Sequence, residues 1–428
     1  MKNLIILMIL IASTVFGQGV DGASLGMAGN YMALSRGISA MALNPANLAL
    51  ERENTLELNL FSLNASIFNS SFSINDYNEY FTDEGNNGHW NRSDKEAILD
   101  LIPDDGFKLY SDITTNLFGI AYDRFGFSSQ IISSSKATMP KKPFEIVLFG
   151  EDLSREYLYH DSNFFDVDAY AAMKLSFGYA HLIDIEDYLP GFSDLAVGMN
   201  VNYYLGIAVA QSLTSDVLLE KIDSETAKTN LQMEYRTATP ESEPFSGGGF
   251  GFDLGASAVF DDVWTFSLSF TNVLASINWD KNTEMNVIIE SDSTNVYEDS
   301  DEDHSVSVDT TYSAGSFKTN LPAKMSMGAA FQMFDNLTLT AEWQQGLNEE
   351  FGNSTTPRVG VGAEYFPLKW LPLRTGMAVG GRVGFLYGMG IGLNFSHFRF
   401  DYSYAMNKAM WPSSSNGLFT ALSMKLLF

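Results

Sequence analysis

The chain contains no cysteine. Disulfide bonds, thiol catalysis and thiolate metal sites are therefore excluded. Basic residues are scarce as well, because 25 Lys and Arg stand against 52 Asp and Glu, for a formal net charge of −27. Nucleic-acid partners are not expected, since they require a basic surface. Acidic loops can instead attract divalent cations or keep an exposed face soluble.

Beyond the N-terminus the sequence has no run of about 20 apolar residues, so no helical membrane span is predicted. At the N-terminus, a basic Lys2 precedes the mostly apolar stretch Leu4–Phe16. This pattern is typical of a secretory signal, and we place cleavage between Gly17 and Gln18. Residues 1–17 are therefore predicted to be a signal peptide. The alternative is a buried N-terminal helix.

Aromatic residues and regular alternation are abundant. Aromatic content is 13%, with 32 Phe and 19 Tyr. From Leu195 to Ala208, apolar residues such as Val197 and Met199 alternate with small or polar ones. Soluble strands are typically about 5 to 6 residues long, so this run is unusual for a soluble sheet.

The chain also ends on an alternating segment. Leu422, Met424, Leu426 and Phe428 share one face, whereas Lys425 lies on the other. A final strand that is apolar on one face and closes on an aromatic residue is typical of an outer-membrane barrel. Phe428 is therefore predicted to be an assembly signal for the barrel assembly machinery.

Strand-like segments number about fourteen, and short turns alternate with long polar loops between them, as in bacterial outer-membrane barrels. We predict an all-β protein, a transmembrane antiparallel β-barrel of about 14 strands spanning residues 51–428. It would lie in the outer-membrane lipid of a Gram-negative bacterium. A soluble sandwich or propeller also explains alternation, but not strand length, signal peptide and terminal Phe together.

Two long polar excursions, 211–247 and 278–320, are expected between strands. The second carries the acidic run Glu298–Asp303, which could bind calcium through several oxygen ligands. A solvated loop is the favoured interpretation, because the run lacks the spacing of a known calcium motif. One short helix is predicted at about Asp94–Ile102, capped by Ser93 and Glu96.

Residues 18–50 are small and apolar and show no strand alternation. Helical turns are expected around Ile38–Leu43, ending before Pro45, because the residue ahead of a proline avoids the helical region. Such a segment is too apolar for a solvated tail and should pack inside the protein.

This segment resembles the N-terminal signature of the FadL/TodX superfamily of outer-membrane transporters. Two groups of residues carry the resemblance: Gly26, Ala28 and Gly29, and then Asn44, Pro45, Ala46, Leu48 and Ala49. Asn47 stands where the family usually has a small residue. The stretches VGVGAEYFPLKWLPLRTGMAVGGR and FRFDYSYA resemble the Bacteroidetes-type branch, which includes PorV-like proteins of the type IX secretion system.

The resemblance implies a fourteen-stranded barrel whose N-terminal segment, residues 18–50, folds into the lumen as a hatch with Asn44, Pro45 and Ala46 as its motif. It also implies passive uptake of small hydrophobic molecules, which the family binds in an external groove and releases through a lateral opening. Two alternatives stay open: a PorV-like barrel that binds a secretion-system protein or attaches proteins to the surface, and a structural outer-membrane protein.

Charged residues recur at the inward-facing positions of the predicted strands. They are Asp253, Lys324, Glu342, Arg358, Glu364, Arg374, Arg382, Arg399, Asp401 and Lys425. One interpretation is a polar gate around the hatch. A structural ion-pair network that fills the interior is favoured, because such barrels normally have polar interiors.

No pattern indicates an enzyme. The five histidines have no metal-ligand spacing, and neither a nucleophile elbow nor a phosphate-binding loop is present. We therefore expect no catalytic residue, no metal and no cofactor.

Overall fold

The computed structural model describes residues 21–52, 54–83, 85, 89–150, 157–185, 189–222, 226–295 and 306–428. The predicted signal peptide, residues 1–17, and the acidic run Glu298–Asp303 lie outside them.

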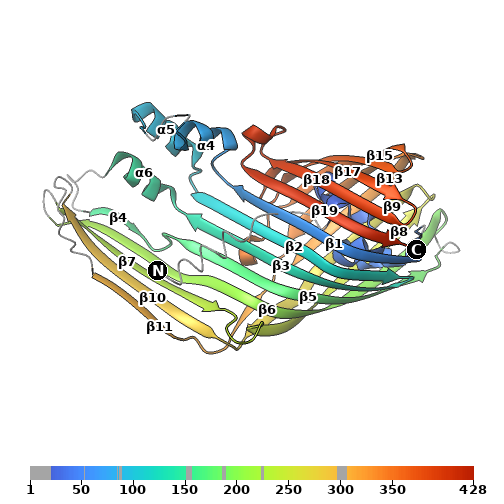
Figure 1. The fold of residues 1–428 in the computed structure, drawn as a ribbon, viewed down its shortest axis with the longest axis horizontal. Coiled ribbons are helices and arrows are strands. Elements are labelled where there is room, and N and C mark those ends of the chain that lie inside the picture. Colours follow the sequence, from blue (N-terminus) through green and yellow to red (C-terminus); the bar gives the residue numbers. More distant parts are fainter. Residues whose placement is uncertain are drawn as a thin grey trace.

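Fourteen antiparallel strands form a closed barrel (Figure 1). In their order around the barrel they are β1 (Leu56–Asn69), β2 (Phe107–Tyr122), β3 (Phe125–Met139), β5 (Asp166–Ile183), β6 (Phe192–Lys221), β8 (Gly247–Phe260), β9 (Trp264–Trp279), β13 (Lys324–Phe334), β14 (Leu337–Gly346), β15 (Arg358–Leu368), β16 (Leu371–Gly380), β17 (Gly384–Phe395), β18 (Phe398–Asn407) and β19 (Gly417–Leu427).

Pairing between the first and last strands closes the ring. β1 and β19 run antiparallel from Glu57↔Leu427 to Phe68↔Gly417. The backbone N–H of Phe428 donates to the carbonyl of Leu56 at 2.9 Å. The predicted fourteen-stranded barrel is thus confirmed.

The two faces of the barrel wall differ in polarity, as β19 illustrates. Lys425 and Ser423 are buried inside, whereas Phe428 is 54% exposed on the outside. Phe419 breaks the apolar-out pattern because it faces inward, where its ring lies 5.4 Å from that of Phe68. A wall that is apolar outside and polar inside suits lipid on the outer surface.

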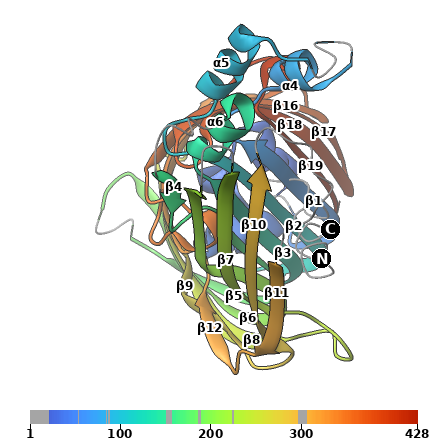
Figure 2. The same ribbon diagram turned by 90° about the vertical axis from the view of Figure 1, so that its left-hand side faces the viewer.

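Short turns gather at the end of the barrel that carries the C-terminus, where Asp123-Arg124 and Asp335-Asn336 join neighbouring strands. Longer connections lie at the opposite end. There β6 continues far beyond the barrel and carries a sheet extension of β4 (Tyr157–Asp161), β7 (Thr226–Ala238), β10 (Thr283–Asn295) and β11 (Val306–Ser313) (Figures 1 and 2). Strand β12 (Phe317–Asn320) pairs with the end of β9.

This extension corrects the prediction that 211–247 and 278–320 are polar excursions. Both contain paired strands, and β6 alone is 30 residues long. The extension stands outside the barrel, and polar residues such as Ser291 and Thr310 interrupt its more apolar face, so it lacks the regular alternation of a barrel wall.

Three helices lie at the long-connection end: α4 (Ile74–Phe81), α5 (Arg92–Leu101) and α6 (Lys141–Phe149) (Figure 1). Helix α5 was predicted, but its capping box is made by Asn91 and Asp94 rather than Ser93 and Glu96. Two 3-10 turns, η3 (Glu350–Gly352) and η4 (Pro412–Ser414), lie in connections. Among the described residues, every helix is too short or too polar to span a membrane.

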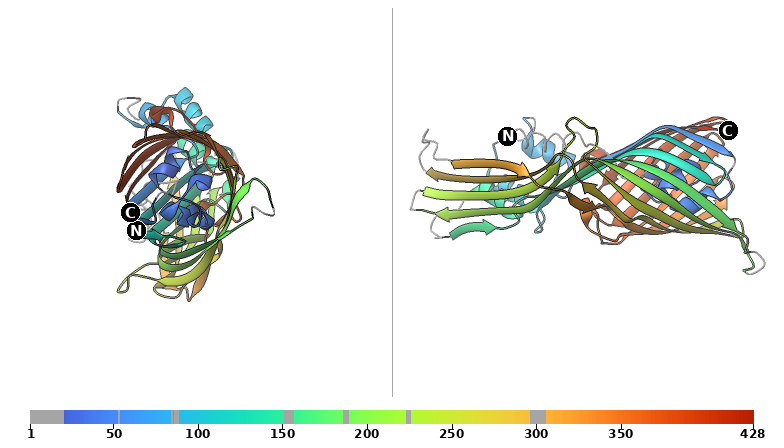
Figure 3. Two further views of the ribbon diagram at one scale, coloured as in Figure 1. Left: turned by 90° about the vertical axis from the view of Figure 1, so that its right-hand side faces the viewer. Right: turned by 90° about the horizontal axis from the view of Figure 1, so that it is seen from below.

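Residues 21–50 form four short helical turns inside the ring of strands (Figure 3). They are α2 (Gly22–Gly26), η1 (Met32–Leu34), α3 (Gly37–Leu43) and η2 (Pro45–Leu48). We call residues 21–50 the lumenal segment.

Candidate functional site in the barrel lumen

Local sequence explains the turns of the lumenal segment. The Asp21 carboxylate caps α2 by accepting from the Ser24 backbone N–H at 3.0 Å. Helix α3 ends at Leu43 because Asn44 precedes Pro45 and is held extended, with φ −155°. The Asn44 side chain then caps η2 by accepting from the Ala46 N–H at 3.1 Å. The predicted helical turn before Pro45 is confirmed.

The predicted hatch motif, Asn44, Pro45 and Ala46, contacts the barrel wall directly. The Asn44 amide donates to the carbonyl of Ala256 at 3.1 Å and to the hydroxyl of Ser257 at 3.0 Å. Opposite the motif, a Cβ on Gly198 would lie 2.5 Å from the backbone nitrogen of Ala46. Only a glycine therefore allows the segment to approach this closely.

Asn47, which departs from the family signature, is fully buried and bridges the segment to the wall. Its amide donates to the Met32 carbonyl at 2.8 Å and to the Ser35 hydroxyl at 3.0 Å. Its side-chain oxygen accepts from the Ser257 hydroxyl at 2.5 Å. A small residue could not make these bonds, so the substitution fits this chain.

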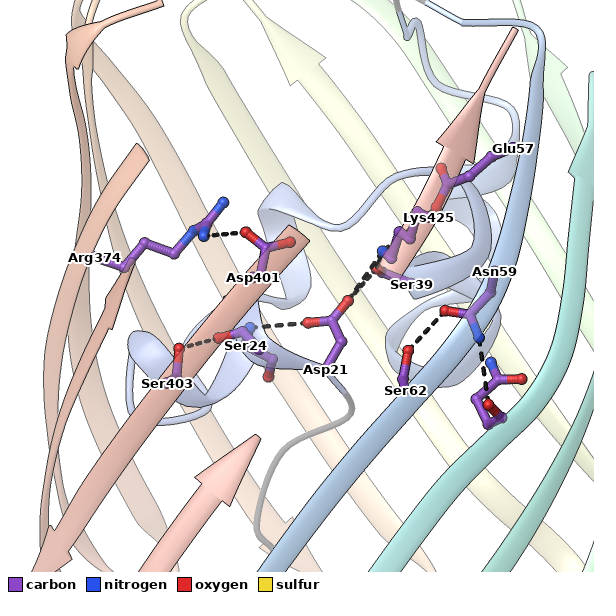
Figure 4. Close-up of polar contacts among 12 residues, drawn as sticks. Asp21, Ser24, Ser39, Glu57, Asn59, Ser62, Arg374, Asp401, Ser403 and Lys425 are labelled. Carbon is purple, nitrogen blue, oxygen red and sulfur yellow. Dashed lines mark hydrogen bonds and ion pairs between the residues drawn. The ribbon is translucent and has the colours of Figure 1, made fainter. Parts of the chain in front are cut away.

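Lys425 lies at the centre of a buried charge cluster between the segment and β1 and β19 (Figure 4). Its Nζ is 3.1 Å from an Asp21 oxygen and 3.3 Å from a Glu57 oxygen. It also donates to the Ser39 hydroxyl at 2.5 Å. One ammonium thus meets carboxylates from both the lumenal segment and the wall.

A second cluster joins β15, β16 and β18. Arg374 binds Glu364 at 2.5 Å and Asp401 at 2.6 Å. Next to it, the Ser403 hydroxyl donates to the carbonyl of Gly22 (Figure 4). One guanidinium here bridges two wall carboxylates, and a neighbouring hydroxyl holds the segment.

Two more predicted residues hold the segment through its backbone. The Met32 N–H donates to a Glu342 oxygen at 3.1 Å. Arg358 donates to the Ala28 carbonyl and, at 3.4 Å, to the Asn30 side chain. The bonds to the Met32 N–H and the Ala28 carbonyl each place a wall charge on a backbone group of the lumenal segment.

Asp253 pairs with a residue that sequence reasoning missed. Its carboxylate is 3.1 Å from Lys174 Nζ and also accepts from the Asn200 amide at 3.1 Å. Asn200 in turn donates to the Met41 carbonyl of the segment at 2.6 Å. Lys174 occupies an inward position of a predicted strand, so the alternation that located Asp253 could have located it too.

Arg382 lies in the turn between β16 and β17 and reaches Asp112 on β2, another residue that was not predicted. Asp112 also accepts from the Ser134 hydroxyl at 2.6 Å. Beside this pair, the β14–β15 connection inserts Phe351 into the lumen, where its ring lies 4.6 Å from that of Tyr170. Phe351 is fully buried.

The structure therefore places the predicted charged residues in the interior. Six are buried: Asp253, Glu342, Arg358, Arg374, Asp401 and Lys425. Four are half-buried: Lys324, Glu364, Arg382 and Arg399. Most of them meet either an opposite charge or the lumenal segment, which is the arrangement expected of an ion-pair network. Phe428 lies on the outer surface at the end of the ring.

Between the lumenal segment and Phe351 lies a cavity of about 260 Å³. Its lining mixes apolar side chains, such as Met32 and Tyr170, with charged ones, such as Lys324 and Glu342. Such a space could hold a small molecule that has an apolar body.

On the outer surface of β8, β9 and β13–β16 lies an apolar hollow of about 870 Å³. Its lining includes the outward-facing Met327 and Val361, but also Glu342, which borders the inner cavity as well.

In the strand register, Glu342 is flanked by Gly328 on β13 and Gly360 on β15. The wall itself has no side chain on either side of Glu342, and Met32 and Asn30 of the lumenal segment pack against the two glycines instead. We call Gly328, Glu342 and Gly360 the glycine row.

Residues 45–402 match the family described as "Family of unknown function (DUF5723)". No curated protein matches the chain. Among solved structures, the P. putida toluene transporter TodX is 13% identical, with 97% of this chain and 99% of that chain covered and a TM-score of 0.51. A TodX deltaS2S3 mutant, described as a monoaromatic hydrocarbon channel, is 12% identical, with 96% and 99% covered and a TM-score of 0.52.

The Ralstonia pickettii toluene transporter TbuX is 14% identical, with 97% of this chain and 99% of that chain covered and a TM-score of 0.49. At these identities the similarity extends to the fold alone. The predicted resemblance to FadL/TodX barrels is confirmed at that level. The PorV-like branch stays a prediction from the sequence.

Proposed function

The chain belongs to the DUF5723 family, whose function is unknown, and from that premise we propose that it is an outer-membrane channel for passive uptake of small hydrophobic molecules. The fold shared with TodX supports this, because the two TodX structures are described as a toluene transporter and a monoaromatic hydrocarbon channel. The predicted signal peptide would direct the chain to export. We propose no catalytic role, in keeping with the channel neighbours.

One observation carries the proposal: a lumenal cavity and an apolar outer hollow share Glu342 across the glycine row. At this row, a hydrophobic molecule in the cavity would be separated from the outer hollow by Glu342 and by Met32 and Asn30, which pack against the two glycines. No wall side chain stands beside Glu342, so a shift of Met32 and Asn30 with the lumenal segment would open the row towards the outer hollow. We propose that the solute crosses the wall at this row.

In this proposal the lumenal segment acts as a hatch. It fills the ring below the cavity and is held by hydrogen bonds and ion pairs rather than by strand pairing. These contacts can be exchanged without breaking the barrel ladder. Their number indicates a segment that rearranges locally instead of leaving the lumen.

Native mass spectrometry of the protein, extracted gently from its own outer membrane, tests the binding part of the proposal. We expect a co-purified small hydrophobic compound. Ser326→Trp should reduce its retention, because Ser326 lines the cavity and the indole would fill it. Met327→Trp should leave it bound, because Met327 faces the outer hollow.

Leu339→Trp is the matched control, since Leu339 faces outward and borders neither space. Equal retention in Ser326→Trp and Leu339→Trp would show that the compound does not occupy the cavity. A stoichiometric protein partner without any small compound would argue instead for the partner-binding alternative.

A further inference from the structure

The sheet extension ends in a strand with a free edge. Strand β11 pairs along its length with β10, from Glu284↔Ser313 to Ser291↔Val306. All residue pairs that the described structure gives β11 are with β10, and all eight of its residues are exposed. Its outer N–H and C=O groups are therefore available to another strand.

Strand β11 lacks the features that usually protect an edge. Its sequence, VSVDTTYS, contains no proline, no lysine and no glycine, and Asp309 is its one charged residue. Valine, threonine and tyrosine favour extended structure. The edge is therefore suited to pairing.

The two faces of the β10–β11 hairpin differ in a way that defines what could pair with it. The register places Ile289 beside Val308 and Met285 beside Tyr312 on one face. Val308 is 46% exposed and Tyr312 is 53% exposed. This face is apolar next to the free edge.

The other face is acidic. It carries Asp309 on β11 and two carboxylates on β10, Glu284 and Glu290. Neither strand contains a lysine or arginine. A strand added at this edge would therefore gain from basic side chains on one face and apolar side chains on the other.

We propose that β11 binds an extended segment of a partner protein by strand addition, and that this segment alternates apolar residues with lysine or arginine. Main-chain hydrogen bonds to the free edge would supply affinity, and the two faces would select the sequence pattern. The proposal concerns the sheet extension and does not depend on the uptake of hydrophobic molecules.

A second copy of the chain is a weaker candidate. If two β11 strands paired about a twofold axis, their acidic faces would lie on the same side of the joined sheet. Like charges in neighbouring strands are destabilising. Charge complementarity therefore favours a basic partner segment.

The position of the edge also suits docking. Strand β6 runs without interruption from the barrel into the extension, where it pairs with β7, and β7 pairs with β10. The ladder thus connects the free edge to the barrel wall. In Figures 1 and 2, the extension projects beyond the end of the barrel opposite the C-terminus.

Fluorescence anisotropy of a labelled octapeptide, Lys-Val-Lys-Val-Thr-Val-Lys-Val, titrated with the full-length protein in detergent tests the proposal. We expect saturable binding. Asp309→Lys should weaken it about five- to tenfold, because an attraction becomes a repulsion. Asp335→Lys, the same charge change in a turn at the opposite end of the barrel, should leave binding unchanged.

Two N-methylated peptides separate strand addition from charge attraction. One is methylated at every valine and the other at every lysine and threonine. Alternate N–H groups of a strand point to opposite edges, so one peptide loses the donors that face β11 and the other loses only those facing solvent. We expect one to bind like the parent and the other at least about tenfold more weakly.

Equal binding of the two methylated peptides would overturn strand addition. No binding of the parent peptide, or no effect of Asp309→Lys, would overturn the proposed segment chemistry. Concentration-dependent dimers that the peptide cannot disrupt would assign the edge to a second copy instead.

Discussion

Lys425 and Asp21 meet inside the barrel although 404 positions separate them in the sequence. Both are almost fully buried; Asp21 depends on Lys425 for compensation of its charge, whereas Lys425 also pairs with Glu57. Removing one partner of such a pair is typically strongly destabilising, because the other stays buried and unpaired. The pair therefore fastens the start of the lumenal segment to the last strand.

This pairing predicts a pH dependence of segment docking. Burial alone would raise the pKa of Asp21, but the charge of Lys425 and hydrogen bonds from Ser39 and the Ser24 backbone lower the pKa from 3.8 to about 2. Because the pKa of Asp21 is lower in the docked state, the ionised carboxylate stabilises docking above about pH 4. This stabilisation is lost as the pH falls towards 2. The contribution is on the order of 2 kcal/mol.

The chain has no native thiol, so a dye on a single cysteine placed at Ala42 can report docking. We expect its fluorescence to change between about pH 4 and 2, and Asp21→Asn to remove that step. An identical transition in Asp21→Asn would show that other groups cause it.

Two glycines of the barrel wall test how closely the hatch motif approaches the wall. A methyl group at Gly198 would lie 2.5 Å from the backbone of the hatch motif, whereas one at Gly248 would make only ordinary contacts. Gly198→Ala should therefore destabilise the protein by about 1 to 3 kcal/mol. Gly248→Ala should change stability little. Thermal unfolding of both variants in one detergent measures the difference, and equal midpoints would contradict the close approach.

Sequence alternation located the inward charges but not their partners. Lys174 and Glu57 sit at inward positions of strands that were recognised, yet nothing in their local sequence shows that they meet Asp253 and Lys425. Contacts between distant strands depend on the order and stagger of the whole ring. A single sequence does not carry that information locally.

At the scale of elements, the strands of the wall were predictable and those of the extension were not. Wall strands such as β8 alternate between the outer surface and the lumen of the barrel, and this leaves a clear pattern. Strand β10 carries Glu284, Glu290 and Asp292 on one face, and its other face mixes apolar residues such as Ile289 with Ser291. In water neither face must be apolar, so the pattern resembles that of a loop.

The last strand gives a prediction at this scale. Phe428→Asp should reduce the amount of folded barrel in the outer membrane. Phe428 lies at the barrel end, where a charge on the lipid face costs only about 0 to 1 kcal/mol. A large loss of assembly would therefore reflect the terminal signal rather than stability. Heat-modifiable mobility on gels measures folded yield, and Phe428→Tyr is the control. Normal yield from Phe428→Asp would count against the signal.

For the whole molecule, the sequence predicted the class and size of the barrel, because strand number follows from counting alternating segments. It also predicted that residues 18–50 pack inside, because a small apolar segment cannot remain solvated. It did not reveal the inserted Phe351 or the glycine row. Both depend on how distant connections and strands meet in the closed ring.

If the proposed function holds, solutes pass only when the lumenal segment can move. A disulfide between Ala33→Cys and Gly328→Cys would fix η1 to β13, since the Cβ of Ala33 lies 3.8 Å from the position of a Cβ on Gly328. That separation is about the mean for disulfides. No other thiol is present to compete.

The measurement is the initial uptake rate of radiolabelled toluene by bacteria that display this double variant in the outer membrane, before and after addition of a reductant, with both single variants as controls. We expect a several-fold slower uptake in the oxidised double variant, recovery on reduction, and no redox effect in the controls. Equal uptake by the oxidised and reduced double variant would contradict this prediction.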